Sequence, residues 1–219
     1  MKILQHAPVA LGATLFLALC AAALARPTTL AAHPTEAEAY AEAYAEAYAE
    51  AYAIDGTHST VLFKVSHFRS SLYYGRFNEV SGEFTFDTAD PAASSVRMVV
   101  RADSVDAKVE NLSKHLRSPD FLDATQFPEI VFESQSVAAG EAADTLEVTG
   151  ELTLRGVTKP VTVTVEKVGE GPGMRGARLM GWHATFTIDR GEFGVDYGIE
   201  RGAVGREVEL IVSVEGHAR

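Results

Sequence analysis

Apolar and polar side chains alternate along most of the chain beyond residue 53, and this alternation indicates its fold. A period of two residues places successive side chains on opposite faces of a β-strand. In 146–154, for example, Leu146, Val148 and Leu152 share one face while Glu147 and Glu151 share the other. The pattern recurs in eight segments, which are 61–67, 82–86, 96–102, 130–133, 146–154, 161–165, 180–188 and 208–214.

Eight strands, each with one apolar and one polar face, predict an all-β protein. Turn signals lie between several of them, including a hairpin connection at 155–160 and a glycine-rich loop at 169–176. Antiparallel strands of this kind close naturally into an eight-stranded barrel, which leaves no exposed sheet edge. A two-sheet sandwich would show the same alternation, so both architectures are compatible with the pattern.

A helical insertion interrupts the strands between the third and the fourth. Helical spacing is carried by Val105, Val109, Leu112 and Leu116. Asp103 or Ser104 is suited to cap the first turn, and Ser118-Pro119 ends the helix. We therefore expect a helical lid from about residue 105, before Phe127-Pro128 returns the chain to strand.

The first 25 residues have the composition of a cleaved signal peptide. Lys2 precedes an uncharged run over 9–20, and the small residues that follow offer a cleavage site after Ala25. A membrane anchor needs about 20 apolar residues, so the short run favours cleavage. A lipoprotein signal would use Cys20, but bulky Leu19 lies where that processing requires a small residue. We expect a periplasmic or secreted protein with no transmembrane span after cleavage.

Cleavage leaves a chain without cysteine, because Cys20 is the single cysteine of the sequence. No disulfide can then stabilise the fold, and packing must do so. Loss of Lys2 also takes the formal net charge from −11 to −12. A surface this acidic argues against nucleic acid and against anionic membrane surfaces as partners.

A low-complexity segment, 26–52, lies between the signal peptide and the strands. From Glu38 to Tyr52 it repeats the motif E-A-Y-A, so tyrosines and glutamates recur at four-residue intervals. Alanine and glutamate favour a helix with a tyrosine stripe, but glutamates four residues apart repel one another. We interpret the segment as a linker, with a binding helix as the alternative, and place the folded domain at 53–219.

Several motifs of this domain resemble those of the YceI-like family. The opening motif combines Tyr52–Asp55, His58-Ser59 and Phe63–His67, and the central motifs are Lys114–Asp123 and Phe127–Ser134. Gly150–Val161 is similar to the family pattern G-x-L-T-x-x-G-V-T-K-P-V, and Asp189–Val195 and the last strand also fit. The resemblance covers roughly Tyr52 to Gly216. The chain departs from the family at Leu112-Ser113, where an Arg-Asp pair is common, and in the E-A-Y-A repeat.

The resemblance implies a lipocalin-like barrel that encloses a polyisoprenoid chain, such as the tail of a quinone, in an elongated apolar cavity. It also implies a periplasmic carrier or reservoir, with a link to stress as a further expectation. No enzymatic activity is implied, and no cofactor beyond the bound lipid. The lipid head group and the existence of a homodimer are left open.

Side chains on the inner faces of the strands and on the lid are the candidates for the lipid-binding cavity. They are Phe63, Val65, His67, Phe84, Phe86, Met98, Val100, Ala102, Phe121, Phe132, Leu152, Trp182 and Phe186. Small residues at Ala102, Gly150 and Ala184 would leave room inside the barrel, or would taper an ordinary core.

His115 and Arg117 are the candidates for contacting the lipid head group, together with His67. Each histidine could equally be a hydrogen-bonded packing residue, and Arg117 could instead pair with Asp120 or Asp123.

Two other functions compete with lipid binding. One is a metal or haem site in which distant histidines meet, drawn from His58, His67, His115 and His183, none of which has H-E-x-x-H or H-x-x-x-H spacing. The other is a structural or interaction barrel without ligand, with the tyrosine repeat as its contact. The sequence has no G-x-S-x-G elbow and no phosphate-binding glycine loop, so we expect no catalytic residue, and no metal ligand.

Overall fold

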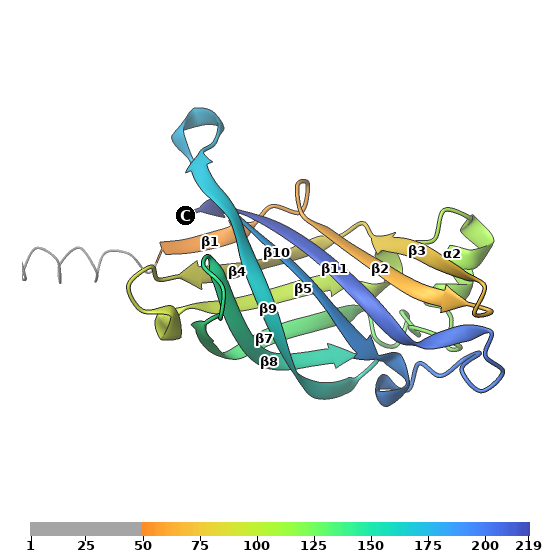
Figure 1. The fold of residues 1–219 in the computed structure, drawn as a ribbon. Helices are drawn as coiled ribbons and strands as arrows, with labels where there is room; N and C mark the ends of the chain where they lie inside the picture. Colours follow the sequence, from red (N-terminus) through yellow and green to blue (C-terminus); the bar gives the residue numbers. More distant parts are fainter. Residues whose placement is uncertain (1–49) are drawn as a thin grey trace, which may run out of the picture. The chain divides into compact units, whose positions relative to one another are not determined.

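The computed structural model describes residues 50–219, and within this range the chain consists mainly of β-strands (Figure 1). The predicted signal peptide and the E-A-Y-A repeat up to residue 49 lie outside the described residues. The strands are β1 (Glu50–Ile54), β2 (Thr60–His67), β3 (Ser71–Phe77), β4 (Val80–Phe86), β5 (Ser95–Arg101), β6 (Val105–Asp106), β7 (Glu129–Ala139), β8 (Thr145–Leu154), β9 (Val157–Pro172), β10 (Arg178–Asp189) and β11 (Val204–Ala218). The helices of this range are the α-helix α2 (Glu110–Arg117) and the 3-10 helices η1 (Pro91–Ala93), η2 (Ala102–Ser104), η3 (Met174–Gly176) and η4 (Arg190–Phe193).

Eight of these strands form a closed antiparallel barrel. They pair in the order β1-β4-β5-β7-β8-β9-β10-β11, and β11 pairs with β1 again, which closes the ring. Every strand of the ring therefore has a partner on both sides. The predicted eight-stranded barrel is confirmed, and the two-sheet sandwich is excluded.

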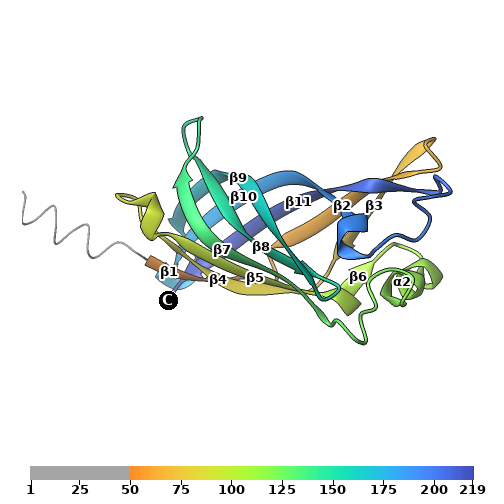
Figure 2. The same cartoon turned by 90° about the horizontal axis from the view of Figure 1, so that it is seen from below.

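β2, β3 and β6 lengthen the barrel wall at one end. β11 pairs with β1 through Gly216–Ala218 and with β2 through residues of Val204–Ser213. β2 and β3 form a hairpin, and β6 adds two residues to the edge of β3. The hairpin continues beyond β1 and β4 toward the end of the barrel that carries α2 (Figure 2).

The last tyrosine of the E-A-Y-A repeat belongs to the barrel. Strand β1 begins at Glu50, and Tyr52 is only 1% exposed, with its ring stacked on Phe84 at a centroid distance of 4.8 Å. Burial and a hydrogen bond to the Glu50 carboxylate raise the pKa of Tyr52 to about 12. The structure thus corrects the predicted linker end at residue 52, because sheet pairing and burial outweigh the helix propensity of the repeat.

Replacing Tyr52 with leucine should lower the free energy of unfolding by about 1–2 kcal/mol, because the variant loses an aromatic pair and part of the buried volume. Urea unfolding followed by the fluorescence of Trp182, the single tryptophan of the chain, measures the change. Tyr74→Leu is the matched control, since Tyr74 is 55% exposed and its loss should cost less than about 0.5 kcal/mol. Equal effects of the two substitutions would show that Tyr52 is not part of the core.

The alternation of apolar and polar residues did not predict strand β3. Leu72, Tyr73 and Tyr74 are consecutive large side chains, so both faces of β3 carry apolar residues. Leu72 and Tyr74 are more than half exposed, whereas the Tyr73 hydroxyl donates a hydrogen bond to the Ala107 carbonyl. A strand with apolar residues on its solvent face shows no period of two, and this is why the pattern missed it.

The lid helix begins later than its spacing predicts. Val105 is part of β6, where it pairs with Phe77, and the helix starts only at Glu110. Lys108 has a left-handed backbone (φ 64°), which interrupts any helix begun at residue 105, so Asp103 and Ser104 cap nothing there. The buried Ser113 hydroxyl instead accepts a hydrogen bond from the Ala107 N–H and fixes this turn.

Among residues 50–219, no helix has the length and hydrophobicity needed to span a membrane.

Candidate binding cavity

A cavity of about 630 Å³ lies inside the barrel, between the strands and α2. Its walls come from β2, β3, β5, β7, β8, β10 and β11, and Leu112, His115 and Leu116 of α2 cover one side. Most lining side chains are aliphatic or aromatic. The polar ones among them are His67, Tyr73, His115, Arg190, Tyr197 and Arg201.

Most of the predicted cavity residues line this space. They are Phe63, Val65, His67, Met98, Val100, Phe121, Phe132, Leu152 and Phe186, and the head-group candidate His115 lines the space too. Those on the strands were found because alternation identifies the inner face of each strand. Four further lining residues lie on correctly predicted strands and follow the same alternation, but they were not named as candidates. They are Ile130, Leu154, Ile188 and Leu210.

A second apolar cavity, of about 140 Å³, lies next to the first. The remaining predicted aromatic residues, Phe84, Phe86 and Trp182, line this second cavity, and so does Ala184. Four residues line both cavities, namely Met98, Phe132, Phe186 and Val212. These four residues, which we call the waist, separate the larger cavity from the smaller one.

Gly150 of β8 allows the Phe132 ring of the waist to lie against the backbone. A Cβ atom at this position would meet the Glu133 carbonyl oxygen and would lie 2.7 Å from the Phe132 Cζ atom. The predicted small residue is therefore present, but its space is filled by Phe132 rather than left empty.

Gly150→Ala should force Phe132 and the β7 backbone to shift and should cost about 1–3 kcal/mol of unfolding free energy. Thermal and urea unfolding measure this cost. Gly169→Ala is the control, because no atom lies within 4 Å of a Cβ at that position. A destabilisation no larger than that of the control would mean that Phe132 does not occupy this place.

Arg190 of η4 ties the loop between η4 and β11 to the cavity wall. Its side chain donates hydrogen bonds to the carbonyls of Gly205 (2.7 Å), Val195 (2.7 Å), Tyr197 (2.9 Å) and Val204 (3.1 Å). The residue is only 4% exposed, and burial lowers its pKa from the ordinary value of an arginine. The guanidinium therefore supports the loop backbone, and its donors are used by these carbonyls.

Aromatic rings surround His115 on the inner side of α2. The His115 ring lies 5.0 Å from the rings of both Phe121 and Tyr197, and its Nε2 atom is 3.0 Å from an oxygen of Asp120. His115 is thus both a packing residue and a polar group at the cavity surface. His67, the other histidine of the wall, lies at the end of β2 with its ring 4.7 Å from that of Phe68.

The cavity opens at the turn between β2 and β3. Phe68 lines the cavity and is nevertheless 63% exposed, so its ring reaches from the interior to solvent. Arg201 and Tyr197 line the cavity too, and the Arg201 guanidinium lies 5.2 Å from the centre of the Tyr197 ring. Burial raises the pKa of Tyr73, which lines the cavity from β3. Tyr73, Tyr197 and Arg201 form the polar part of the wall together with His67 and His115.

Two predicted site residues lie elsewhere. The predicted strand extends one residue too far at Ala102, which is buried in η2 and bonded through its N–H to the Pro128 carbonyl. Arg117 pairs with Glu110, two helical turns earlier, at 3.2 Å, and also contacts the Val105 carbonyl. Arg117 therefore does not line the cavity as a head-group candidate would, and the alternative pairing with Asp120 or Asp123 is not formed either.

Sequence reasoning missed Arg190, Tyr197 and Arg201. All three lie between β10 and β11, where the chain has no regular period and side-chain direction cannot be predicted. The only available signal was the motif Asp189–Val195, which was noted as part of the family resemblance without a role for Arg190.

The histidines considered for a metal or haem site are spread over the barrel. His67 and His115 line the cavity, whereas His58 precedes the opposite end of β2 and is bonded to Asp55. Within the described part of the chain, these histidines do not form one cluster with His183.

The fold and its internal cavity define a lipocalin-like antiparallel barrel. The profile of the YceI-like domain matches residues 52–216. The chain therefore belongs to the YceI-like family.

Relatives and solved structures agree with this assignment. Over 162 residues the chain is 41% identical to the protein YceI of Shigella flexneri and 40% identical to a UPF0312 protein of Pseudomonas aeruginosa, covering 74% of this chain and 83% of each relative. The fold is similar to that of BcnA from Burkholderia cenocepacia, with a TM-score of 0.67, 24% identity and coverage of 74% of this chain and 98% of BcnA. It is also similar to a polyisoprenoid binding domain from Saccharophagus degradans, with a TM-score of 0.60, 18% identity and coverage of 78% and 99%.

Proposed function

We propose that this protein binds one long apolar lipid of the polyisoprenoid class inside its barrel and acts as a periplasmic carrier or reservoir. The observation that carries the proposal is the cavity of about 630 Å³ with its nearly continuous apolar wall. Its volume lies within the range of about 300–1,000 Å³ typical of ligand pockets. The neighbour from Saccharophagus degradans, described as a polyisoprenoid binding domain, supports the choice of lipid class.

The apolar wall supplies the affinity. Burial of one isoprene unit, about five carbons, contributes on the order of 4 kcal/mol at roughly 0.8 kcal/mol per carbon group. About five units would already approach the practical affinity ceiling of 18–21 kcal/mol. Cavity depth, rather than accumulated affinity, therefore selects the tail length, and the waist at Phe132 is where a longer tail would pass into the smaller cavity.

The polar part of the wall is suited to the head group. Among its groups, His67, His115, Tyr197 and Arg201 can donate hydrogen bonds to the oxygens of a quinone, an alcohol or a phosphate, whereas the Tyr73 hydroxyl already donates to the Ala107 carbonyl. We propose binding rather than catalysis, because among the described lining residues there is no carboxylate, thiol, serine or threonine. On this proposal the lipid is the ligand and no further cofactor takes part.

Uptake of polyprenols by the delipidated protein tests the proposal. Native mass spectrometry should detect one polyprenol per chain. Trp182 lines only the smaller cavity, so its emission should stay constant with short polyprenols and change once the chain is long enough to pass the waist. Absence of a complex at every chain length would contradict the proposed function, and a change in emission with the shortest chains would contradict the order of filling.

A further inference from the structure

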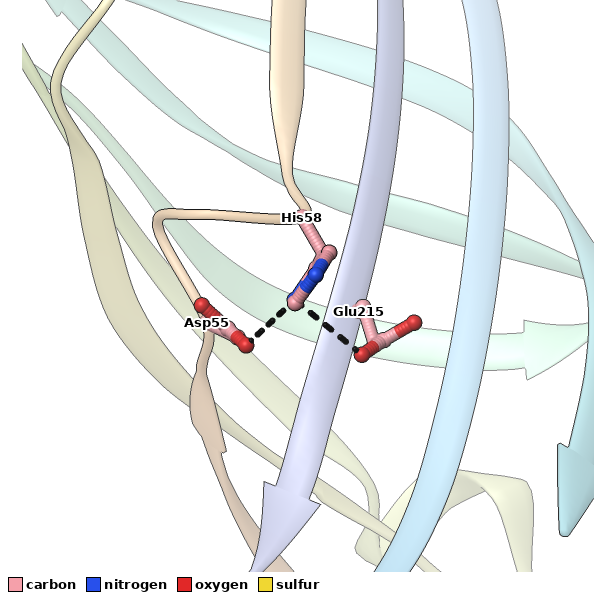
Figure 3. Close-up of side chains that lie close together, drawn as sticks. All are labelled: Asp55, His58 and Glu215. Carbon is pink, nitrogen blue, oxygen red and sulfur yellow. Dashed lines mark hydrogen bonds and ion pairs between the residues drawn. The ribbon is translucent and has the colours of Figure 1, made fainter. Parts of the chain in front are cut away.

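Two histidines and two carboxylates meet on the barrel at the seam between β1 and β11. Asp55 follows β1, His58 lies in the turn before β2, and Glu215 and His217 belong to β11. Figure 3 shows three of these side chains directed toward one another. Asp55 Oδ2 lies 2.8 Å from His58 Nδ1 and 3.0 Å from His217 Nε2. Glu215 Oε1 lies 3.7 Å from each of the same two nitrogens.

Three of these atoms, from Asp55, His58 and Glu215, all lie within 4.8 Å of one another, and His217 Nε2 lies beside the two carboxylates. Metal–nitrogen and metal–oxygen distances of about 2.0–2.2 Å require neighbouring ligand atoms to be roughly 3.3–3.6 Å apart. The four measured separations, from 2.8 to 3.7 Å, lie on both sides of this range. Asp55, His58 and Glu215 can therefore supply three ligands, and a fourth position is left for water or for His217 after a movement of its side chain.

The backbone already holds the carboxylates in place. The Thr57 N–H donates a hydrogen bond to Asp55 Oδ1, which leaves Oδ2 directed at the histidines. The Asp55 N–H donates to the Glu215 carbonyl at 2.8 Å, and the Glu215 N–H donates to the Ser59 hydroxyl at 3.1 Å. These hydrogen bonds hold the turn before β2 against the end of β11. The backbone that carries the ligands therefore needs little rearrangement when an ion binds.

An ion can reach this cluster from solvent. The side chains of His58 and His217 are 62% and 43% exposed, whereas Asp55 is 19% exposed. Two carboxylates would neutralise the charge of a divalent ion. Imidazole and carboxylate ligands in tetrahedral arrangement suit zinc better than calcium or magnesium, which prefer more oxygen ligands.

We propose that Asp55, His58 and Glu215, with His217 beside them, form a binding site for one divalent transition-metal ion, with Zn²⁺ as the best match. The bound ion would join the first turn of the barrel to its last strand, where β1 and β11 close the ring. The sequence has a single cysteine and so no internal disulfide, and the ion would supply a cross-link at this seam. The site is separate from the cavity, and the proposal is independent of the lipid.

Metal binding to the full chain, purified without a polyhistidine tag and stripped with a chelator, tests this proposal. Isothermal titration with Zn²⁺ should give one ion per chain, and Co²⁺ should give the visible absorption of a tetrahedral site. Zn²⁺ should also raise the melting temperature. His58→Gln and Glu215→Gln should each weaken Zn²⁺ binding at least tenfold. His183→Gln, which removes a histidine of β10 outside the cluster, should leave binding unchanged.

The wild-type chain provides a second readout that does not depend on the folding of any variant. Zn²⁺ should shift the amide NMR signals around residues 55–58 and 215–217 and leave those around His67 and His115 unchanged. The proposal is wrong if no ion binds, if the three variants bind Zn²⁺ equally well, or if the shifted signals lie at the cavity instead.

Discussion

Val65→Trp combined with Leu210→Trp should weaken binding of a polyprenol about 1,000-fold while the barrel stays folded. Both residues line the larger cavity, one on β2 and the other on β11. Two indole rings would take up the room of at least one isoprene unit. Loss of about 4 kcal/mol of apolar burial corresponds to roughly three orders of magnitude in affinity.

The matched control places two tryptophans on the outer face of the same two strands. Thr60 and Ser213 are exposed and pair with each other across β2 and β11. Thr60→Trp with Ser213→Trp should leave polyprenol affinity within about twofold of wild type, since no lining atom changes. If the inner pair folds and binds polyprenol as tightly as the outer pair does, the lipid is not held in this cavity.

Arg190→Met should lower the free energy of unfolding by about 3–5 kcal/mol. Four carbonyls lose their donor together, and a buried acceptor left without a partner costs about 1–3 kcal/mol before relaxation. Urea unfolding followed by Trp182 fluorescence measures the loss. Arg190→Lys should recover only a part of it, because an ammonium cannot reach the carbonyls in the arrangement of a planar guanidinium.

Arg206→Met is the control for Arg190→Met. The Arg206 side chain is 56% exposed and pairs with Asp189 at 3.3 Å, so its removal should cost less than about 1 kcal/mol. Similar losses for the two arginines would show that the four carbonyl contacts do not hold the loop between η4 and β11.

The strands of the barrel were largely predictable because each has one wet and one dry face. Phe63, Met98 and Leu152 were placed on the inner face by their period alone, and they line the cavity. The exceptions have physical causes. Tyr52 lies in a repeat rich in helix-forming residues, and its strand exists because β4 and β11 offer hydrogen-bond partners on both sides.

The empty volume of the cavity could not be predicted from sequence. Alternation identifies which side chains point inward, but not whether they meet across the barrel. Gly150 illustrates the difficulty, since the space left by its missing side chain is filled by Phe132. The loop residues Tyr197 and Arg201 are also beyond prediction, because their positions depend on the four hydrogen bonds of Arg190.

The group of Asp55, His58, Glu215 and His217 shows how residues distant in sequence come together only in the fold. Asp55 and His58 are close in sequence, but Glu215 and His217 lie about 160 positions later and reach them only when β11 closes on β1. No metal-binding motif in the sequence could have joined these two pairs.

Native mass spectrometry of the protein purified from its own host tests the central claim most directly. We expect each chain to carry one apolar lipid, and we expect solvent extraction to release a polyisoprenoid compound. A protein that retains no lipid under gentle purification, or that retains only phospholipid, would contradict the proposal that this cavity holds a polyisoprenoid chain.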